Sequence, residues 1–245
     1  MFRILTYNVH RCVGTDRRLD VGRIAEVIAA ESPDIVALQE VDVGRARTGK
    51  VDQAHDIARR LGMAARFHAA LKVEEEQYGD ALLTARPERL IQAGPLPGYR
   101  RMRRLEPRGA LWVAINFGRG REVQVINTHL GLVPREQQIQ AAALVGDAWL
   151  GSAHRRDPVI LVGDFNATVR TVVHRTLRGA LTDARALRPE RRGRIATFPA
   201  LAPVLRIDHV FVSAGVRVLG LRASASSLSR LASDHLPLVM DFELE

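Results

Sequence analysis

This chain is almost without cysteine and has few aromatic residues. Cys12 is the only cysteine, which excludes an intramolecular disulfide framework and a zinc site built from several cysteines. Phenylalanine, tryptophan and tyrosine together make up 5% of the residues. Proteins that bind single-stranded nucleic acid stack bases on several aromatic rings, and this chain supplies few of them.

The chain also lacks a long apolar run. No segment approaches the ~20 consecutive apolar residues that a bilayer-spanning helix needs. Residues 1–10 have the pattern of a strand, with neither the basic start nor the cleavage site of a secretory signal peptide. We therefore expect a soluble, cytoplasmic protein with no transmembrane segment, for which peripheral contact with a membrane surface stays open.

Lysine is scarce and arginine is abundant. The chain has 36 Lys+Arg against 27 Asp+Glu, a net charge of +9, and Lys50 and Lys72 are its only lysines. Arginine is always charged and binds phosphate through two parallel hydrogen bonds. The charge favours an anionic partner, either a phospholipid head group or nucleic acid, although abundant arginine can also be a habit of a whole genome. No pattern indicates an obligate protein partner.

The 245 residues, of which 47% are hydrophobic, suffice for one domain spanning 1–245. Helical spacing of apolar residues predicts helices at 20–31, 52–61, 134–150 and 168–177. Apolar runs predict strands at 2–9, 35–41, 64–71, 79–84, 89–93, 109–117, 122–130, 158–162, 206–212, 216–223 and 238–244. Helices and strands alternate, and hairpins occur beside crossovers. This pattern predicts an α/β protein with a mixed sheet or two packed sheets and helices outside.

Two long irregular stretches, 94–107 and 183–204, are rich in arginine, and loops of this length in a compact domain are usually functional. The first contains Arg100, Arg101, Arg103 and Arg104, and the second contains Arg185, Arg188, Arg191, Arg192 and Arg194.

Polar side chains follow six of the apolar runs. The segments are Thr6-Tyr7-Asn8-Val9, Leu38-Gln39-Glu40-Val41, Asn127-Thr128-His129-Leu130, Gly163-Asp164-Phe165-Asn166, Arg206-Ile207-Asp208-His209 and Ser233-Asp234-His235. Buried charges are costly unless paired, so we expect these groups to converge. Carboxylate and amide oxygens without cysteine suit Mg²⁺ or Mn²⁺. Imidazoles beside such a cation suit phosphoester hydrolysis.

Together these six segments resemble, in order and spacing, the motif set of the endonuclease/exonuclease/phosphatase superfamily, the deoxyribonuclease-I-like fold. They run through almost the whole chain. The resemblance implies a four-layer α/β/β/α sandwich, in which two mixed β-sheets pack face to face with helices outside. It also implies an active site at one edge of the sheets.

The resemblance also implies roles for individual residues. The metal site would comprise Asn8, Glu40 and Asp234, with Glu40 as the principal ligand. Asp164 would align or deprotonate the attacking water, and Asn166 would hold that water or the phosphate. His235 would contact the phosphate with Asp208 as its carboxylate partner, and His129 would be a second imidazole facing the phosphate. Substrate contacts would come from Asn127 and from Arg108, which follows Glu106 into a strand.

Each of these residues also has an ordinary structural interpretation. Glu40 alone would read as a surface acid, and Asp164 with Asn166 as an Asx turn that enters a helix. Asp208 could pair with Arg206 on the same strand face instead of with His235. Five further histidines match no motif and are interpreted as structural, namely His10, His55, His68, His154 and His174. His209 is excluded because its side chain should point away from that of Asp208.

The substrate is not determined by these residues, because a fold does not select a function. The residues favour a metal-dependent hydrolase of a phosphodiester that need not be DNA, with a phospholipid as the leading candidate. Apolar side chains between the arginines of the first loop support a lipid. A DNA or RNA nuclease is the alternative, because the arginine-rich loops could follow a phosphate backbone. A catalytically silent binding module on the same fold is the third possibility.

Overall fold

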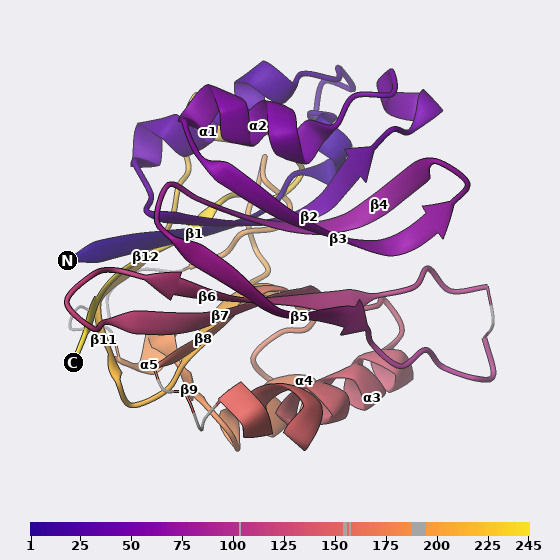
Figure 1. The fold of residues 1–245 in the computed structure, drawn as a ribbon. Coiled ribbons are helices and arrows are strands. Elements are labelled where there is room, and N and C mark those ends of the chain that lie inside the picture. The colour runs from indigo at the N-terminus through magenta and orange to yellow at the C-terminus, as the bar shows by residue number, and fades with distance from the viewer. Residues whose placement is uncertain (103, 154–155, 157, 188–194) are drawn as a thin grey trace.

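The computed structural model describes residues 1–102, 104–153, 156, 158–187 and 195–245. Figure 1 shows four layers, in which α1 and α2 cover one sheet, a second sheet packs beneath it, and α3 and α4 cover the outer face of the second sheet. The predicted four-layer sandwich is confirmed.

Both sheets have six strands. In spatial order, the first sheet contains β11 (Val216–Ala223), β12 (Leu238–Leu244), β1 (Phe2–Asn8), β2 (Ile35–Val43), β4 (Glu76–Thr84) and β3 (Ala64–Val73). The second contains β5 (Glu88–Pro95), β6 (Gly109–Asn116), β7 (Glu122–His129), β8 (Val159–Asp164), β10 (Asp208–Val212) and β9 (Thr182–Asp183). The α-helices are α1 (Val21–Glu31), α2 (Gln53–Leu61), α3 (Pro134–Val145), α4 (Val172–Arg178), α5 (Ala184–Leu187) and α6 (Ser227–Ala232). Short 3-10 turns lie at His10–Cys12 and Ala46–Thr48, and a π turn lies at Asp147–Gly151.

The strands read as continuous apolar runs because both faces of each sheet are covered. On β1, Ile4 packs between the sheets, while its neighbour Leu5 packs beneath the helices of the first layer. On β8, Val162 faces the other sheet and Leu161 faces the layer of α3 and α4. The alternation expected of a strand therefore places apolar side chains in two different cores.

Strand pairing brings the predicted site residues to one edge. β1 runs parallel to β2, with Asn8 opposite Gln39, and β7 runs parallel to β8, with His129 opposite Asp164. β10 runs antiparallel to β8 and begins with Asp208 opposite Asp164. The ends of β1, β2, β7 and β8 therefore meet the start of β10.

Local signals place most helix boundaries correctly. Asp20 caps α1, since its side chain accepts from the backbone N–H of Arg23 at 2.9 Å. The helix predicted at 134–150 is wrong at its C-terminal end, because α3 ends at Val145, Gly146 is extended (ψ 173°) and a π turn follows it. The helix predicted to begin at 168 instead begins after Thr171, whose side chain caps α4.

Some predicted features lie outside the described residues, namely Arg103, His154, Arg188, Arg191, Arg192 and Arg194. Among the residues that the structure describes, no helix combines the length and apolarity needed to cross a bilayer.

Candidate active site

A cavity of about 450 Å³ opens at the edge where these strands end. Seven of the predicted site residues line it, namely Glu40, Arg108, His129, Asp164, Asn166, Asp234 and His235. Asn8, Asn127 and Asp208 lie behind this lining and are at most 1% exposed.

Asp208 and His235 form the predicted hydrogen bond. His235 Nδ1 lies 3.0 Å from Asp208 Oδ2, and its other ring nitrogen, Nε2, lies 3.7 Å from Asp164 Oδ2. Burial disfavours the protonated ring, but the carboxylates of Asp208 and Asp164 outweigh it and raise the pKa of His235 to about 10. His235 is therefore an imidazolium at neutral pH.

Asp164 occupies the centre of the site. Its Oδ2 atom accepts from Asn8 Nδ2 at 3.0 Å and lies 3.5 Å from His129 Nε2. Burial and the Asp208 carboxylate raise the pKa of Asp164 to about 7, although His235 and the hydrogen bond from Asn8 oppose the shift. A carboxylate that titrates near neutral pH can accept a proton during a reaction and release it again.

A β-bulge directs Glu40 into the cavity. The pairing of β2 with β4 shifts register between Leu38 and Val41, and Glu40, with a φ of 59°, lies within that shift. Bulges of this kind re-aim side chains next to active sites. Glu40 is therefore a residue of the cavity wall and not the ordinary surface acid that its sequence context alone suggests.

Asn8 bridges two carboxylates instead of presenting an oxygen to a metal. Its Nδ2 atom donates to Glu40 Oε1 and to Asp164 Oδ2, each at 3.0 Å. Its Oδ1 atom accepts from the backbone N–H of His10 at 3.0 Å. The amide nitrogen of Asn8, not its oxygen, therefore faces the acidic groups, and its role as a metal ligand stays a prediction.

His129 lies between Arg108 and Asn166. Arg108 Nη1 lies 3.2 Å from Nδ1 of His129, and Asn166 Nδ2 lies 3.0 Å from Nε2. Arginine can only donate, so Nδ1 accepts and the neutral ring carries its proton on Nε2, which lies 3.5 Å from Asp164 Oδ2. Burial, Arg108 and His235 lower the pKa of His129 well below its usual value. His129 is therefore a neutral ring in the site.

Arg108 satisfies both interpretations that its sequence context allows. It pairs with Glu106 at 3.0 Å, which is the ordinary ion pair, and it also lines the cavity while only 7% exposed. The predicted Asx turn is likewise present, because Asp164 Oδ1 accepts from the backbone N–H of Asn166 at 2.9 Å. That turn is part of the site and not an alternative to it.

The prediction that Asn127 contacts substrate is not supported by its surroundings. Its Nδ2 atom donates to the carbonyls of Leu38 (2.9 Å) and Ala81 (3.0 Å), and its Oδ1 atom accepts from Gln39 Nε2 at 2.7 Å. Leu38 and Ala81 are opposite each other where the β2 bulge begins. Asn127 therefore joins the two sheets and satisfies carbonyls beside the bulge.

The cavity can hold a divalent cation. Glu40, Asp164 and Asp234 supply carboxylate oxygens to its wall. Oxygen-rich sites of this kind suit Mg²⁺ or Mn²⁺. The side chain of Asp234 is 40% exposed and sits 3.9 Å from His10, so it stands at the open side of the cavity.

Further residues complete the site. His10, interpreted as structural from the sequence, lines the cavity with Arg11, Arg47 and Tyr78. Thr197 donates a hydrogen bond from its hydroxyl to Asp208 Oδ2, and the ring of the next residue, Phe198, lies 4.9 Å from that of His235. The position of His10, two residues after Asn8, was the available signal for that histidine, whereas Arg47 carried none.

Comparison with known proteins identifies the family of this chain. Residues 5–235 match the model of the endonuclease/exonuclease/phosphatase family. The chain is 28% identical to the uncharacterized protein YbhP of Escherichia coli over 260 residues, covering 99% of this chain and 96% of YbhP. Among solved structures, mannosyl-6-phosphatase Bt3783 of Bacteroides thetaiotaomicron has a TM-score of 0.81 at 19% identity, and all of both chains is covered. The human nocturnin catalytic domain has a TM-score of 0.75 at 21% identity, covering 100% of this chain and 93% of that one. The chain belongs to the endonuclease/exonuclease/phosphatase family.

Proposed function

We propose that this protein is a Mg²⁺- or Mn²⁺-dependent hydrolase that cleaves phosphodiesters by in-line attack of water. The observation that carries the proposal is the meeting of Asp164, Glu40 and the Asp208–His235 pair at one cavity. Members of this family hydrolyse phosphoesters, and the set of acidic and imidazole side chains that such chemistry needs is complete here. A catalytically silent binding module would not need this set.

In the proposed reaction, Asp164 holds the attacking water and takes its proton. Its pKa of about 7 suits this role, because the deprotonated form is abundant at neutral pH. Asn166, fixed to the same turn, points its amide nitrogen at His129 and at the carbonyl oxygen of Leu130, which leaves its Oδ1 atom to accept a hydrogen bond from the water. Asn8 keeps the Asp164 carboxylate in place through its 3.0 Å hydrogen bond.

His235 stabilises the charge that develops on the phosphoryl oxygens. The imidazolium is held by Asp208, and a cation placed beside a developing negative charge lowers the barrier. Arg108 adds a second cation to the wall of the cavity, beside the neutral ring of His129. Glu40 and Asp234 would hold the divalent cation, which when bound supplies Lewis-acid stabilisation of the phosphate and leaving oxygens.

A neighbouring cavity supports a substrate with an apolar part. It has a volume of about 340 Å³ and shares Glu106 with the catalytic cavity. Its walls include the apolar side chains of Leu96, Met102 and Leu105 and the ring of Tyr99. A phospholipid would place its phosphate at Asp164 and part of its organic group in this second cavity, whereas a DNA backbone offers no comparable apolar group.

A nuclease remains the second candidate function, because arginines surround the mouth of the site. Arg11 and Arg47 line the catalytic cavity, and Arg100 lines the neighbouring one. Such side chains can follow a phosphate backbone. Bt3783, which has the same fold, is a mannosyl-6-phosphatase. The test should therefore also include phosphate monoesters.

The test is a substrate panel with Mg²⁺ or Mn²⁺. It comprises phosphatidylglycerol and cardiolipin vesicles, plasmid DNA, RNA, bis(p-nitrophenyl) phosphate and sugar phosphates, with Asp164→Asn as the matched inactive control. We expect wild-type enzyme to cleave the phospholipids and the generic phosphodiester faster than DNA. Faster cleavage of DNA or RNA would replace the lipid proposal with the nuclease. If no ester is cleaved, the protein is better described as a catalytically silent binding module.

A further inference from the structure

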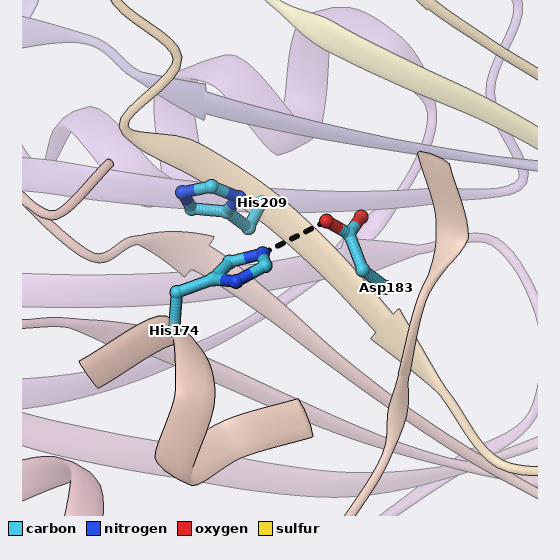
Figure 2. Close-up of side chains that lie close together, drawn as sticks. All are labelled: His174, Asp183 and His209. Carbon is cyan, nitrogen blue, oxygen red and sulfur yellow. Dashed lines mark hydrogen bonds and ion pairs between the residues drawn. The ribbon is translucent and has the colours of Figure 1, made fainter. Parts of the chain in front are cut away.

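A second buried cluster of ionisable side chains lies behind the catalytic turn. Figure 2 shows His174 on α4, Asp183 at the end of β9 and His209 on β10 pointing toward one another. Each of the three residues is at most 5% exposed. Potential ligand atoms of all three lie within 4.8 Å of one another, as in a metal site.

A guanidinium already supplies the positive charge in this cluster. Arg206 Nη2 donates to Asp183 Oδ2 and lies 2.9 Å from His209 Nδ1. His174 Nε2 lies 2.9 Å from the same Asp183 oxygen. Because Arg206 stands between the carboxylate and the imidazole, it occupies the place that a bound cation would need.

This arrangement fixes the tautomer of His209. An arginine can only donate, so Nδ1 of His209 accepts and the ring proton is on Nε2. Nε2 then donates to the carbonyl oxygen of Ala167 at 2.7 Å. Burial and the neighbouring Arg206 lower the pKa of His209 to about 3, which keeps the ring neutral and the tautomer unchanged at neutral pH.

Ala167 directly follows the turn that carries Asp164 and Asn166. Asn166 has a left-handed backbone, with a φ of 49°, a conformation that asparagine adopts more readily than most residues other than glycine. Gln137 Nε2 donates to the carbonyl oxygen of Asn166 at 2.9 Å, and His209 donates to that of the next residue. The turn is therefore held by hydrogen bonds from α3 and from β10.

We propose that His209 is a positioning residue for the hydrolytic reaction, oriented by the Arg206–Asp183 pair and holding the catalytic turn through Ala167. The expected effect of His209 on the reaction rate rests on the proposed function. His209 does not line the catalytic cavity, so it acts through the placement of Asp164 and Asn166.

Two substitutions separate positioning from simple packing. His209→Phe keeps an aromatic ring against Phe165 and Phe211, which lie 5.7 Å from His209 between ring centroids, but it removes the donor. His209→Gln keeps an N–H donor that can reach Ala167. Loss of one buried hydrogen bond at a catalytic turn is expected to lower kcat roughly tenfold in His209→Phe with little change in KM. His209→Gln should recover most of the loss.

Hydrogen exchange gives a readout that needs no substrate. The backbone amide of Asn166, which donates to Asp164 Oδ1, should exchange faster in His209→Phe than in wild type or His209→Gln. Amides of β1 should be unaffected. An inactive wild-type protein would overturn the proposed function and leave the exchange result standing. Unchanged Asn166 exchange, or equal kcat in the Phe and Gln variants of an active enzyme, would overturn the positioning role.

Discussion

The side chains of Asp208 and His235 meet at 3.0 Å across the start of β10 and the loop that precedes β12. The competing partner, Arg206, turns to the other side and pairs with Asp183. Asp208 therefore pairs with His235, the imidazole that faces Asp164. Thr197 donates a further hydrogen bond to the same Asp208 oxygen. The charge of His235 consequently depends on Asp208.

Replacing Asp208 with asparagine should lower the pKa of His235. In the wild-type protein the carboxylates raise that pKa to about 10, so the imidazolium persists through neutral pH. Without Asp208, the proton is lost at a lower pH, and the alkaline limb of the kcat/KM profile should move to lower pH. We also expect kcat to fall by roughly 10²-fold, the scale for an electrostatic catalytic group. An unchanged pH profile would show that His235 does not act as a cation held by Asp208.

Glu40→Gln should weaken metal binding without unfolding the protein. The bulge of β2 directs Glu40 into the cavity beside Asp164, so the substitution removes a charged oxygen ligand. Loss of affinity for Mn²⁺ should be at least about tenfold, measured by calorimetric titration. The exposed Glu26 of α1 supplies the matched control, Glu26→Gln. Equal Mn²⁺ affinity in both variants would remove Glu40 from the metal site.

The effects of Asp164→Asn and His235→Ala should not be additive. Each substitution is expected to reduce kcat by roughly 10²-fold or more. Both side chains act on one transition state, with His235 Nε2 3.7 Å from Asp164 Oδ2, so the double variant should lose less than the product of the two effects. Single-turnover rates for the four proteins decide the question. Full additivity would mean that the two residues act independently.

The buried cluster predicts part of the acid sensitivity of the fold. His209 has a pKa of about 3 when folded and near 6.5 when unfolded. The unfolded chain therefore binds the proton first as pH falls, and stability that is complete above about pH 6.5 is lost progressively toward pH 3. Arg206, Asp183 and His174 face the ring of His209. The pKa of Asp183 is also lowered, despite burial, by His174 and Arg206. Protonation of Asp183 therefore causes a further loss of folding stability at still lower pH.

Urea unfolding at pH 7 and pH 4.5 measures the part of the folding stability that is lost when His209 is protonated. The free energy of unfolding should fall by less between these two pH values in His209→Phe than in wild type. An equal loss of stability in wild type and His209→Phe would show that His209 is not the titrating group.

The six motifs, through their resemblance to the family, predict the four layers and most of the site. Apolar runs that end in polar residues predict β1, β7 and β8. Asp208 and His235 meet although β10 and β12 belong to different sheets, which strand order along the chain does not reveal. The exclusion of His209 from the cavity also follows from strand alternation and is confirmed by its contact with Ala167.

Three side-chain arrangements have causes that one sequence does not display. The side chain of Asn127 donates hydrogen bonds to two backbone carbonyls beside a bulge in a different strand. Bulges have no firm sequence signature. The amide of Asn8 turns its nitrogen to the acids because the backbone N–H of His10 binds its oxygen. The role of Arg206 depends on Asp183, which lies 23 residues earlier in the chain.

The most direct test of the account is phosphodiester hydrolysis before and after removal of divalent cations. Bis(p-nitrophenyl) phosphate would be incubated with wild-type protein and with Asp164→Asn, first after exhaustive chelation and then with Mg²⁺ or Mn²⁺ restored. We predict no turnover by chelated wild type, recovery on addition of either cation, and at least about 10²-fold lower activity of Asp164→Asn than of wild type once the cation is restored. Hydrolysis that survives chelation, or that Asp164→Asn sustains at the wild-type rate, would contradict a metal-dependent reaction centred on Asp164.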